Sequence, residues 1–229
     1  MALTSPLTAR QSLALTAILL GVTAAMFAIA LALGFLLPHH LLLLLTGILV
    51  VHGIAMITTI HIALRRAGTS WRALGFEPPT WRLLHLLWQV PLLLVTLIVV
   101  QGLVLVVTGQ NPAGGRDGID SLISAVGTPA IVLIVIAVVA LAPIWEEAAF
   151  RGVIFGAIRR RWSTSVAVLG SAALFAIMHG APILLAYMAT AGVGFALLRV
   201  FHRSLWGSVL AHMVLNGVAT SVTLVTLLS

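Results

Sequence analysis

Seven long apolar segments dominate this chain and limit the folds open to it. They occupy residues 12–37, 41–64, 83–108, 128–158, 164–180, 183–198 and 205–228. About 20 apolar residues in a helix cross the hydrocarbon core of a bilayer, and every segment reaches or approaches that length. Hydrophobic residues make up 61% of the chain and charged residues only 7%, which soluble domains do not match. The sequence therefore predicts an all-α, polytopic transmembrane bundle of seven to eight helices.

The distribution of arginine predicts how the bundle is oriented. All basic residues are arginines, and they lie in short loops rather than on one basic face, so nucleic acid is not an expected partner. One side of the predicted membrane carries Arg10, Arg65, Arg66, Arg72, Arg82, Arg159, Arg160, Arg161, Arg199 and Arg203. The other side carries only Arg116. The positive-inside rule then places the N-terminus in the cytoplasm. The Arg-, Ala-, Leu- and Val-rich composition favours a bacterial cell membrane.

The fourth apolar segment is too long for one straight span. Residues 128–161 would extend about 50 Å as a helix, whereas the hydrocarbon core is about 30 Å thick. Pro143 lies within it, and proline breaks or kinks a helix. We expect one helix up to about Leu141 and a second from about Ile144 to Arg160. Backbone carbonyls freed at such a break require protein or water around them, which predicts a cavity beside Pro143.

Two adjacent carboxylates follow this proline inside the apolar segment. Ionisable side chains in hydrocarbon are costly, so they usually serve a function. Glu147 and Arg151 are four residues apart and share a helix face, so they are expected to pair. Glu146 lies about 100° away around the helix and has no partner in its own turn. Glu147 is therefore expected to be structural, and Glu146 is the better candidate for a general base.

Two later segments each carry a pair of residues at one-turn spacing. The first pair is an aromatic residue and a histidine, and the second is a histidine and an asparagine. Phe175 and His179 lie in Leu-Phe-Ala-Ile-Met-His-Gly, and His212 and Asn216 lie in Ala-His-Met-Val-Leu-Asn-Gly. At a rise of 1.5 Å per residue, these side chains and Glu146 all fall within the thickness of the membrane core. The three helices can therefore bring them together in one inner cavity.

A glutamate and two histidines can carry out acid–base chemistry on water. Glu146, alone or with His179, would take a proton from water as it attacks a carbonyl carbon. His212 and the Asn216 amide could donate hydrogen bonds to the developing oxyanion. The chain has no cysteine and no Gly-x-Ser-x-Gly motif, so a covalent acyl-enzyme is not expected.

The pattern Glu146-Glu147-x-x-x-Arg151, Phe175-x-x-x-His179, His212-x-x-x-Asn216 resembles the CAAX-protease and bacteriocin-processing (CPBP/ABI) family of intramembrane glutamate proteases. That family is related to the Ras-converting CAAX prenyl endopeptidases. The resemblance covers roughly residues 128–220, read as the catalytic core of a single membrane domain over 1–229; the spans in 1–127 have no assigned role. It implies an endopeptidase acting on a peptide or protein substrate at or in the membrane, prenylated in the eukaryotic relatives.

The resemblance also implies a role for each motif residue. Glu146 and His179 would activate water, and His212 and Asn216 would form the oxyanion hole. Glu147, Arg151 and Phe175 would support the site. No cofactor is expected. Glu146, His179 and His212 would suit zinc as a minority alternative, although the His-Glu-x-x-His motif of zinc proteases is absent.

Other interpretations of the same residues stay open. The glutamates and Arg151 could form a structural ion-pair network, His179 could bind a carbonyl at its helix end, and His212 could link helices. The protein could then be a non-catalytic immunity-type or peptide- or lipid-binding membrane protein. A proton-coupled transporter using Glu146 is less favoured, because the chain is short and has no internal repeat. The remaining histidines, including His52 and His61, are interpreted as structural.

Overall fold

The computed structural model describes residues 3–37, 41–109 and 128–228, and within these ranges the chain is helical with no strand. Arg116, the one arginine predicted on the opposite side of the membrane, lies outside the described residues. The elements are α1 (Ala9–Leu36), α2 (Leu41–Arg66), α3 (Trp71–Leu74), η2 (Trp81–His85), α4 (Leu86–Thr108), α6 (Thr128–Val135), η4 (Ile136–Leu141), α7 (Ala142–Glu147), η5 (Ala148–Ile154), α8 (Phe155–Arg159), α9 (Thr164–Met178), η6 (Pro182–Leu184), α10 (Leu185–His202) and α11 (Leu205–Leu228). The predicted all-α class is confirmed.

Six of the described helices are long and apolar enough to cross a membrane, and α9 is a shorter apolar helix. Each of the seven predicted segments corresponds to one of these helices or to one continuous helical run.

Helix α3 was not predicted. It is a single turn that begins with a hydrogen bond from the Ala73 N–H to the Ser70 side chain and ends at Gly75, whose φ is 132°. The chain is an integral membrane protein.

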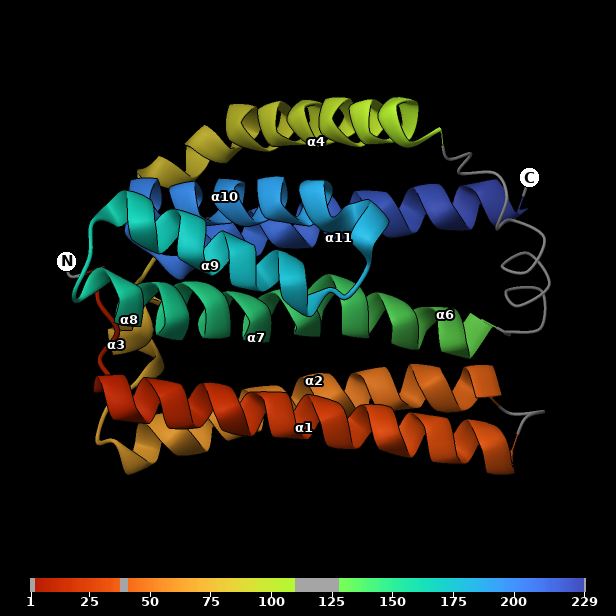
Figure 1. Ribbon diagram of the computed structural model, residues 1–229, viewed down its shortest axis with the longest axis horizontal. Coiled ribbons are helices and arrows are strands. Elements are labelled where there is room, and N and C mark those ends of the chain that lie inside the picture. Colours follow the sequence, from red (N-terminus) through yellow and green to blue (C-terminus); the bar gives the residue numbers. More distant parts are fainter. Residues whose placement is uncertain (1–2, 38–40, 110–127, 229) are drawn as a thin grey trace.

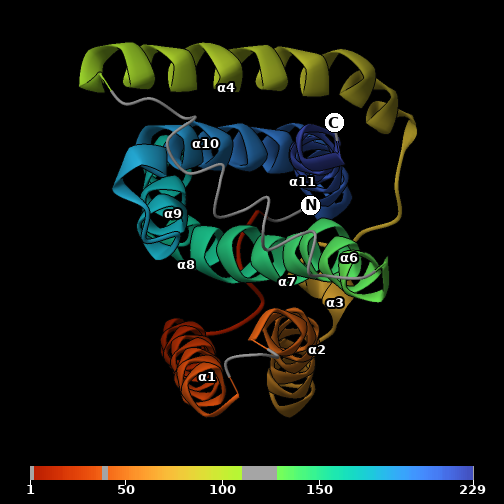
Figure 2. The ribbon, with the colours of Figure 1, turned by 90° about the vertical axis from the view of Figure 1, so that its right-hand side faces the viewer.

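The helices stack in layers (Figure 1). Helices α1 and α2 form a pair on one side, the α6–α8 run and α9–α11 lie in the middle, and α4 lies on the far side. Figure 2 shows the same order with α1 and α2 seen almost end-on. The ends of α1, α2, α8 and α10 that carry basic residues lie at the same end of the bundle.

The predicted break at Pro143 does not occur. The backbone stays helical from α6 through α8, and two π-helical segments, η4 and η5, lie on either side of α7. In the first of these, the Ala142 N–H donates to the Ala137 carbonyl, five residues earlier. This wider turn accepts a proline ring that a regular α-helical turn would exclude, so the run bulges instead of breaking.

Helices α9 and α10 approach each other closely at a glycine. A Cβ atom on Gly192 would lie 2.9 Å from Cα of Ala172 and 3.0 Å from its Cβ. Small residues let membrane helices pack backbone to backbone, and this contact holds α10 against α9. The Gly192 carbonyl is thereby brought within reach of the glutamate-bearing helix.

Candidate active site

The centre of the site is a completely buried ion pair. Nη1 of Arg151 lies 3.0 Å from Oε1 of Glu147, and both side chains are 0% exposed. Nη2 of Arg151 donates to the Gly192 carbonyl at 3.0 Å. The four-residue spacing on one helix predicts this pair, but no sequence pattern indicates the contact with the carbonyl on α10. A buried guanidinium needs such additional partners because an uncompensated charge is expensive there.

Aromatic rings surround the Arg151 guanidinium. Its Cζ lies 4.5 Å from the ring centre of Phe175, 5.2 Å from that of Phe195 and 5.8 Å from that of Phe150. The faces of aromatic rings attract cations, so these three rings replace part of the hydration that burial removes. Phe175, expected to support the site, therefore contacts both the arginine and His179.

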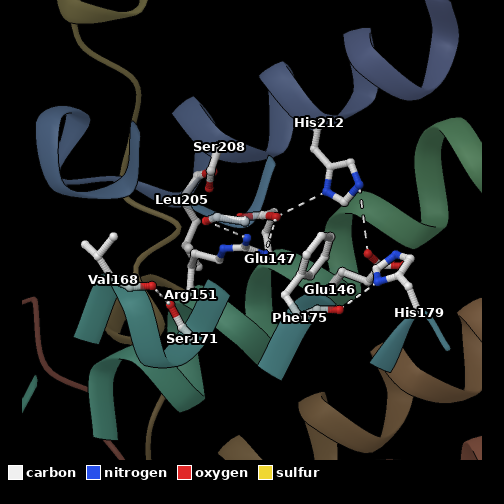
Figure 3. A network of polar contacts seen from close by, with 11 residues as sticks. Glu146, Glu147, Arg151, Val168, Ser171, Phe175, His179, Leu205, Ser208 and His212 are labelled. Carbon is white, nitrogen blue, oxygen red and sulfur yellow. Dashed lines mark hydrogen bonds and ion pairs between the residues drawn. The ribbon is translucent and has the colours of Figure 1, made fainter. Parts of the chain in front are cut away.

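His212 links the ion pair to the second glutamate. Its ring stacks on Phe195 with the centroids 4.4 Å apart and the planes 21° from parallel. Nδ1 lies 3.1 Å from Oε1 of Glu147, and Nε2 lies 3.8 Å from Oε2 of Glu146. Because a carboxylate only accepts, Nδ1 carries the proton of this hydrogen bond, and Nε2 faces Glu146. Figure 3 shows the imidazole between the two carboxylates.

Glu146 is the carboxylate on the cavity side. Its side chain is 13% exposed, whereas that of Glu147 is fully covered. Among the described residues, none hydrogen-bonds to its Oε2 atom, which is buried. The 3.8 Å separation from His212 is too long for a direct hydrogen bond. The two neighbouring glutamates thus have different surroundings: Glu147 is enclosed and bound through Oε1 to Arg151 and His212, whereas Glu146 faces a cavity.

His179 stands at the end of α9 with a fixed proton position. Its Nδ1 atom lies 2.7 Å from the Phe175 carbonyl oxygen. A carbonyl accepts, so Nδ1 donates, and the neutral ring keeps its lone pair on Nε2. The structural alternative for this residue predicted such a bond, and the bond is present. The same bond leaves Nε2 able to accept a proton. His179 and Glu146 line the same two cavities.

Asn216 repairs the backbone where the proline removes a donor. In this π-helical turn each N–H donates to the carbonyl five residues earlier, as Ala142 does to Ala137. The next residue, Pro143, would donate to the Val138 carbonyl, but proline has no N–H. The Asn216 side chain supplies the missing bond, with Nδ2 2.9 Å from the Val138 oxygen. Asn216 also lines the first cavity. The expected freed carbonyl is therefore present, and a side chain from α11 covers it.

Glu146 lies on the walls of two cavities. The first has a volume of about 410 Å³ and is lined by His212 and Asn216 among others. The second has a volume of about 300 Å³ and is lined mainly by apolar side chains of α1, α2 and α9 together with the glutamate helix. The residues common to both walls are His52, Trp145, Glu146 and His179. His52, on α2, was interpreted as structural from the sequence, since the sequence alone does not indicate which helix this side chain faces.

The described residues contain no group of three or more His, Cys, Asp or Glu side chains arranged to hold a metal ion. Glu146, His179 and His212, the three named for zinc, surround the first cavity. Their nitrogen and oxygen donors do not converge on one point within the described part of the chain.

Together, the fold and the site define an integral membrane protein with a buried glutamate–histidine cluster on the wall of an internal cavity. Residues 128–218 match the family model described as Type II CAAX prenyl endopeptidase Rce1-like. That family is a protease family, and the resemblance seen in the sequence is confirmed over this segment. Helices α1, α2 and α4 lie outside the matched residues. Searches among curated proteins and among solved structures give no match.

Proposed function

We propose that this protein is an intramembrane endopeptidase that hydrolyses a peptide bond of a membrane-associated substrate. The observation that carries this proposal is the facing pair of Glu146 Oε2 and His212 Nε2, 3.8 Å apart on the wall of an internal cavity. The match to a protease family over the same helices supports it. The arginine-bearing end of the bundle is cytoplasmic in this proposal, by the positive-inside rule.

Charge balance in the buried cluster assigns one proton. Glu146, Glu147 and Arg151 carry two negative charges and one positive charge when all are ionised. A net charge is costly in a low-dielectric interior, so one further proton is held by the cluster. Glu146 and His212 face each other and are the two groups that can share it. With the proton on His212, Glu147 balances the imidazolium through Nδ1, and Nε2–H faces the cavity.

This state is ready for hydrolysis by water. A water molecule about 2.8 Å from the Glu146 carboxylate would lose a proton to it as its oxygen bonds to the carbonyl carbon. His179 assists through the lone pair on Nε2. The Nε2–H of His212 donates to the oxyanion as the carbonyl π bond opens. When the C–N bond breaks, Glu146 returns its proton to the leaving amine, and the cluster regains its starting charge.

Asn216 has a supporting role in this scheme. One N–H of its amide is used by the Val138 carbonyl, so at most the other can reach an oxyanion. No resident metal or cofactor is required by these steps. The zinc alternative predicts a different result: turnover would stop with a chelator and return when zinc is added, whereas the glutamate mechanism is unaffected by chelation.

The test is turnover of defined peptides by the purified protein in liposomes. A panel of internally quenched peptides is used, each with a C-terminal CAAX sequence in a farnesylated and an unmodified form. Glu146→Gln should reduce cleavage to the background rate while the thermal unfolding temperature is retained. Glu77→Gln is the matched control, because Glu77 pairs with the exposed Arg72 and lines neither cavity. Undiminished cleavage by Glu146→Gln would remove the proposal.

A further inference from the structure

His52 belongs to a helix outside the family match and nevertheless lines the site. It lies on α2, whereas the matched segment begins at residue 128. His52 is one of the few residues common to the walls of both cavities. A side chain in this position is at the boundary between the two spaces that flank Glu146.

A threonine on the neighbouring helix determines which ring nitrogen of His52 carries the proton. Nε2 of His52 lies 3.1 Å from Oγ1 of Thr23 on α1. The Thr23 hydroxyl donates its only hydrogen to the Leu19 carbonyl, at 3.1 Å. It can therefore only accept from His52, so Nε2 carries the proton and the neutral ring keeps its lone pair on Nδ1. No residue in the described ranges hydrogen-bonds to Nδ1.

The ring of His52 is also held in place from the catalytic side. Its centroid lies 5.5 Å from that of Trp145, with the planes 80° apart. Trp145 directly precedes Glu146 in the sequence and lines the same two cavities. The hydrogen bond to α1 and the edge-on contact to α7 together leave the imidazole little freedom to turn. A fixed acceptor beside the carboxylate requires little ordering when it binds a donor.

We propose that His52 is a substrate-binding residue, whose Nδ1 accepts a hydrogen bond from a backbone N–H of the substrate peptide. This inference rests on the proposed function. A peptide held there crosses from one cavity into the other directly beside Glu146. The scissile carbonyl lies in the first cavity near His212, and an apolar side chain beside it lies in the second, against Leu19 and Met56.

Replacements of His52 can separate its two nitrogen positions. His52→Gln can keep an N–H for Thr23 at the position of Nε2 but has no acceptor at the position of Nδ1. His52→Asn places an amide oxygen near the position of Nδ1. We expect KM for the cleaved peptide to rise about tenfold in His52→Gln with kcat nearly unchanged, and to rise less in His52→Asn. His61→Gln is the control, because His61 lies on the same helix and contacts Trp71 instead of the cavities.

N-methylated peptides identify the hydrogen bond itself. One methylated amide in the peptide should weaken cleavage by the unmodified protein about tenfold and should not weaken cleavage by His52→Gln any further. An independent loss in each would show that the ring does not accept from the peptide backbone. Unchanged KM in His52→Gln would overturn the inference while leaving the endopeptidase assignment intact.

Binding measurements keep the two proposals distinguishable. The same peptides, labelled with a fluorophore, are titrated into the Glu146→Gln protein with and without His52→Gln, and anisotropy gives Kd. A tenfold weaker Kd supports the role of His52 even where no peptide is cleaved, which would count against the proposed function alone. Equal Kd values in the two proteins, or no binding of any panel peptide, would count against the inference.

Discussion

The imidazole of His212 and the carboxylate of Glu147 are joined by a contact of 3.1 Å between Nδ1 and Oε1. The same oxygen accepts from Arg151 at 3.0 Å. One carboxylate oxygen on the glutamate helix therefore fixes both a cation on its own helix and a ring on α11. In this orientation the Nε2 atom of His212 faces Glu146. The buried Glu147 therefore determines how the imidazole is oriented toward Glu146 at the cavity.

Replacing Glu147 with glutamine should remove this control of His212. A neutral amide cannot balance an imidazolium, so His212 would stay neutral and Nε2 would have no hydrogen for an oxyanion. Loss of one such donor lowers kcat by about 10²–10³. Steady-state kinetics on the cleaved peptide measures this, and near-normal kcat in Glu147→Gln would contradict the role given to His212. Glu77→Gln again serves as the control for the glutamate-to-glutamine change.

The Arg151 guanidinium should matter more for stability than for chemistry. Arg151→Met leaves the buried Glu147 carboxylate without its partner, which costs about 3–5 kcal/mol of unfolding free energy. The double replacement Arg151→Met and Glu147→Met removes both charges and should be much less destabilising than Arg151→Met alone. Reversible unfolding in mixed micelles measures the three variants. If the double variant is no more stable than Arg151→Met, the unpaired Glu147 charge is not the main cause of the lost stability.

Asn216 and Pro143 should compensate each other. Asn216→Leu leaves the Val138 carbonyl without its donor, which costs about 1–3 kcal/mol. Pro143→Ala restores an N–H in the backbone, so the double variant should recover most of this stability. Unfolding measurements test the rescue. Peptide cleavage by the double variant then separates the two roles: recovered activity means that Asn216 only repairs the backbone, and lost activity means that its amide also touches the reacting group.

The second cavity should be the route by which membrane-anchored substrate reaches Glu146. It is lined by Leu20 of α1 and Met178 of α9, each 44% exposed. The chain has no cysteine, so a single introduced pair can be bridged specifically. Bridging Leu20→Cys to Met178→Cys with a cleavable bis-thiol reagent should stop cleavage of anchored peptides, and reduction should restore it.

The matched control for this bridge lies on the opposite side of the bundle. Leu92 of α4 and Leu197 of α10 line another surface groove and are 58% and 53% exposed. Bridging cysteines at these positions should leave cleavage unchanged. Equal inhibition by the two bridges would point to a general loss of flexibility, and no inhibition by the first bridge would place the route elsewhere.

Gly192 should tolerate no side chain. A methyl group there would meet Ala172 at 2.9–3.0 Å, separating α9 from α10 and moving the carbonyl that Arg151 binds. Gly192→Ala should lower the unfolding free energy by about 1–3 kcal/mol. Gly102→Ala on α4 is the control, because its Cβ would meet nothing within 4 Å. Equal stability of the two variants would show that the helices adjust.

The sequence was sufficient to predict the helical segments and the ion pair between Glu147 and Arg151 on one helix. Uninterrupted apolar length predicts spans because hydrocarbon forces every backbone group to bond within its own segment. The Glu147–Arg151 contact depends only on helical periodicity. The response to Pro143 could not be predicted, because a break and a π-helical bulge both accommodate proline, and the choice depends on whether another helix covers the freed carbonyl.

The amino-acid sequence specifies the chemically capable groups and the helices that carry them. Contacts between helices determine which of two adjacent glutamates is enclosed, which nitrogen of His179 and His212 carries the proton, and that His52 of α2 borders the site. These properties depend on contacts between helices distant in sequence. Periodicity defines the faces of one helix, whereas the rotation and depth of each helix against its neighbours follow from packing of the whole bundle.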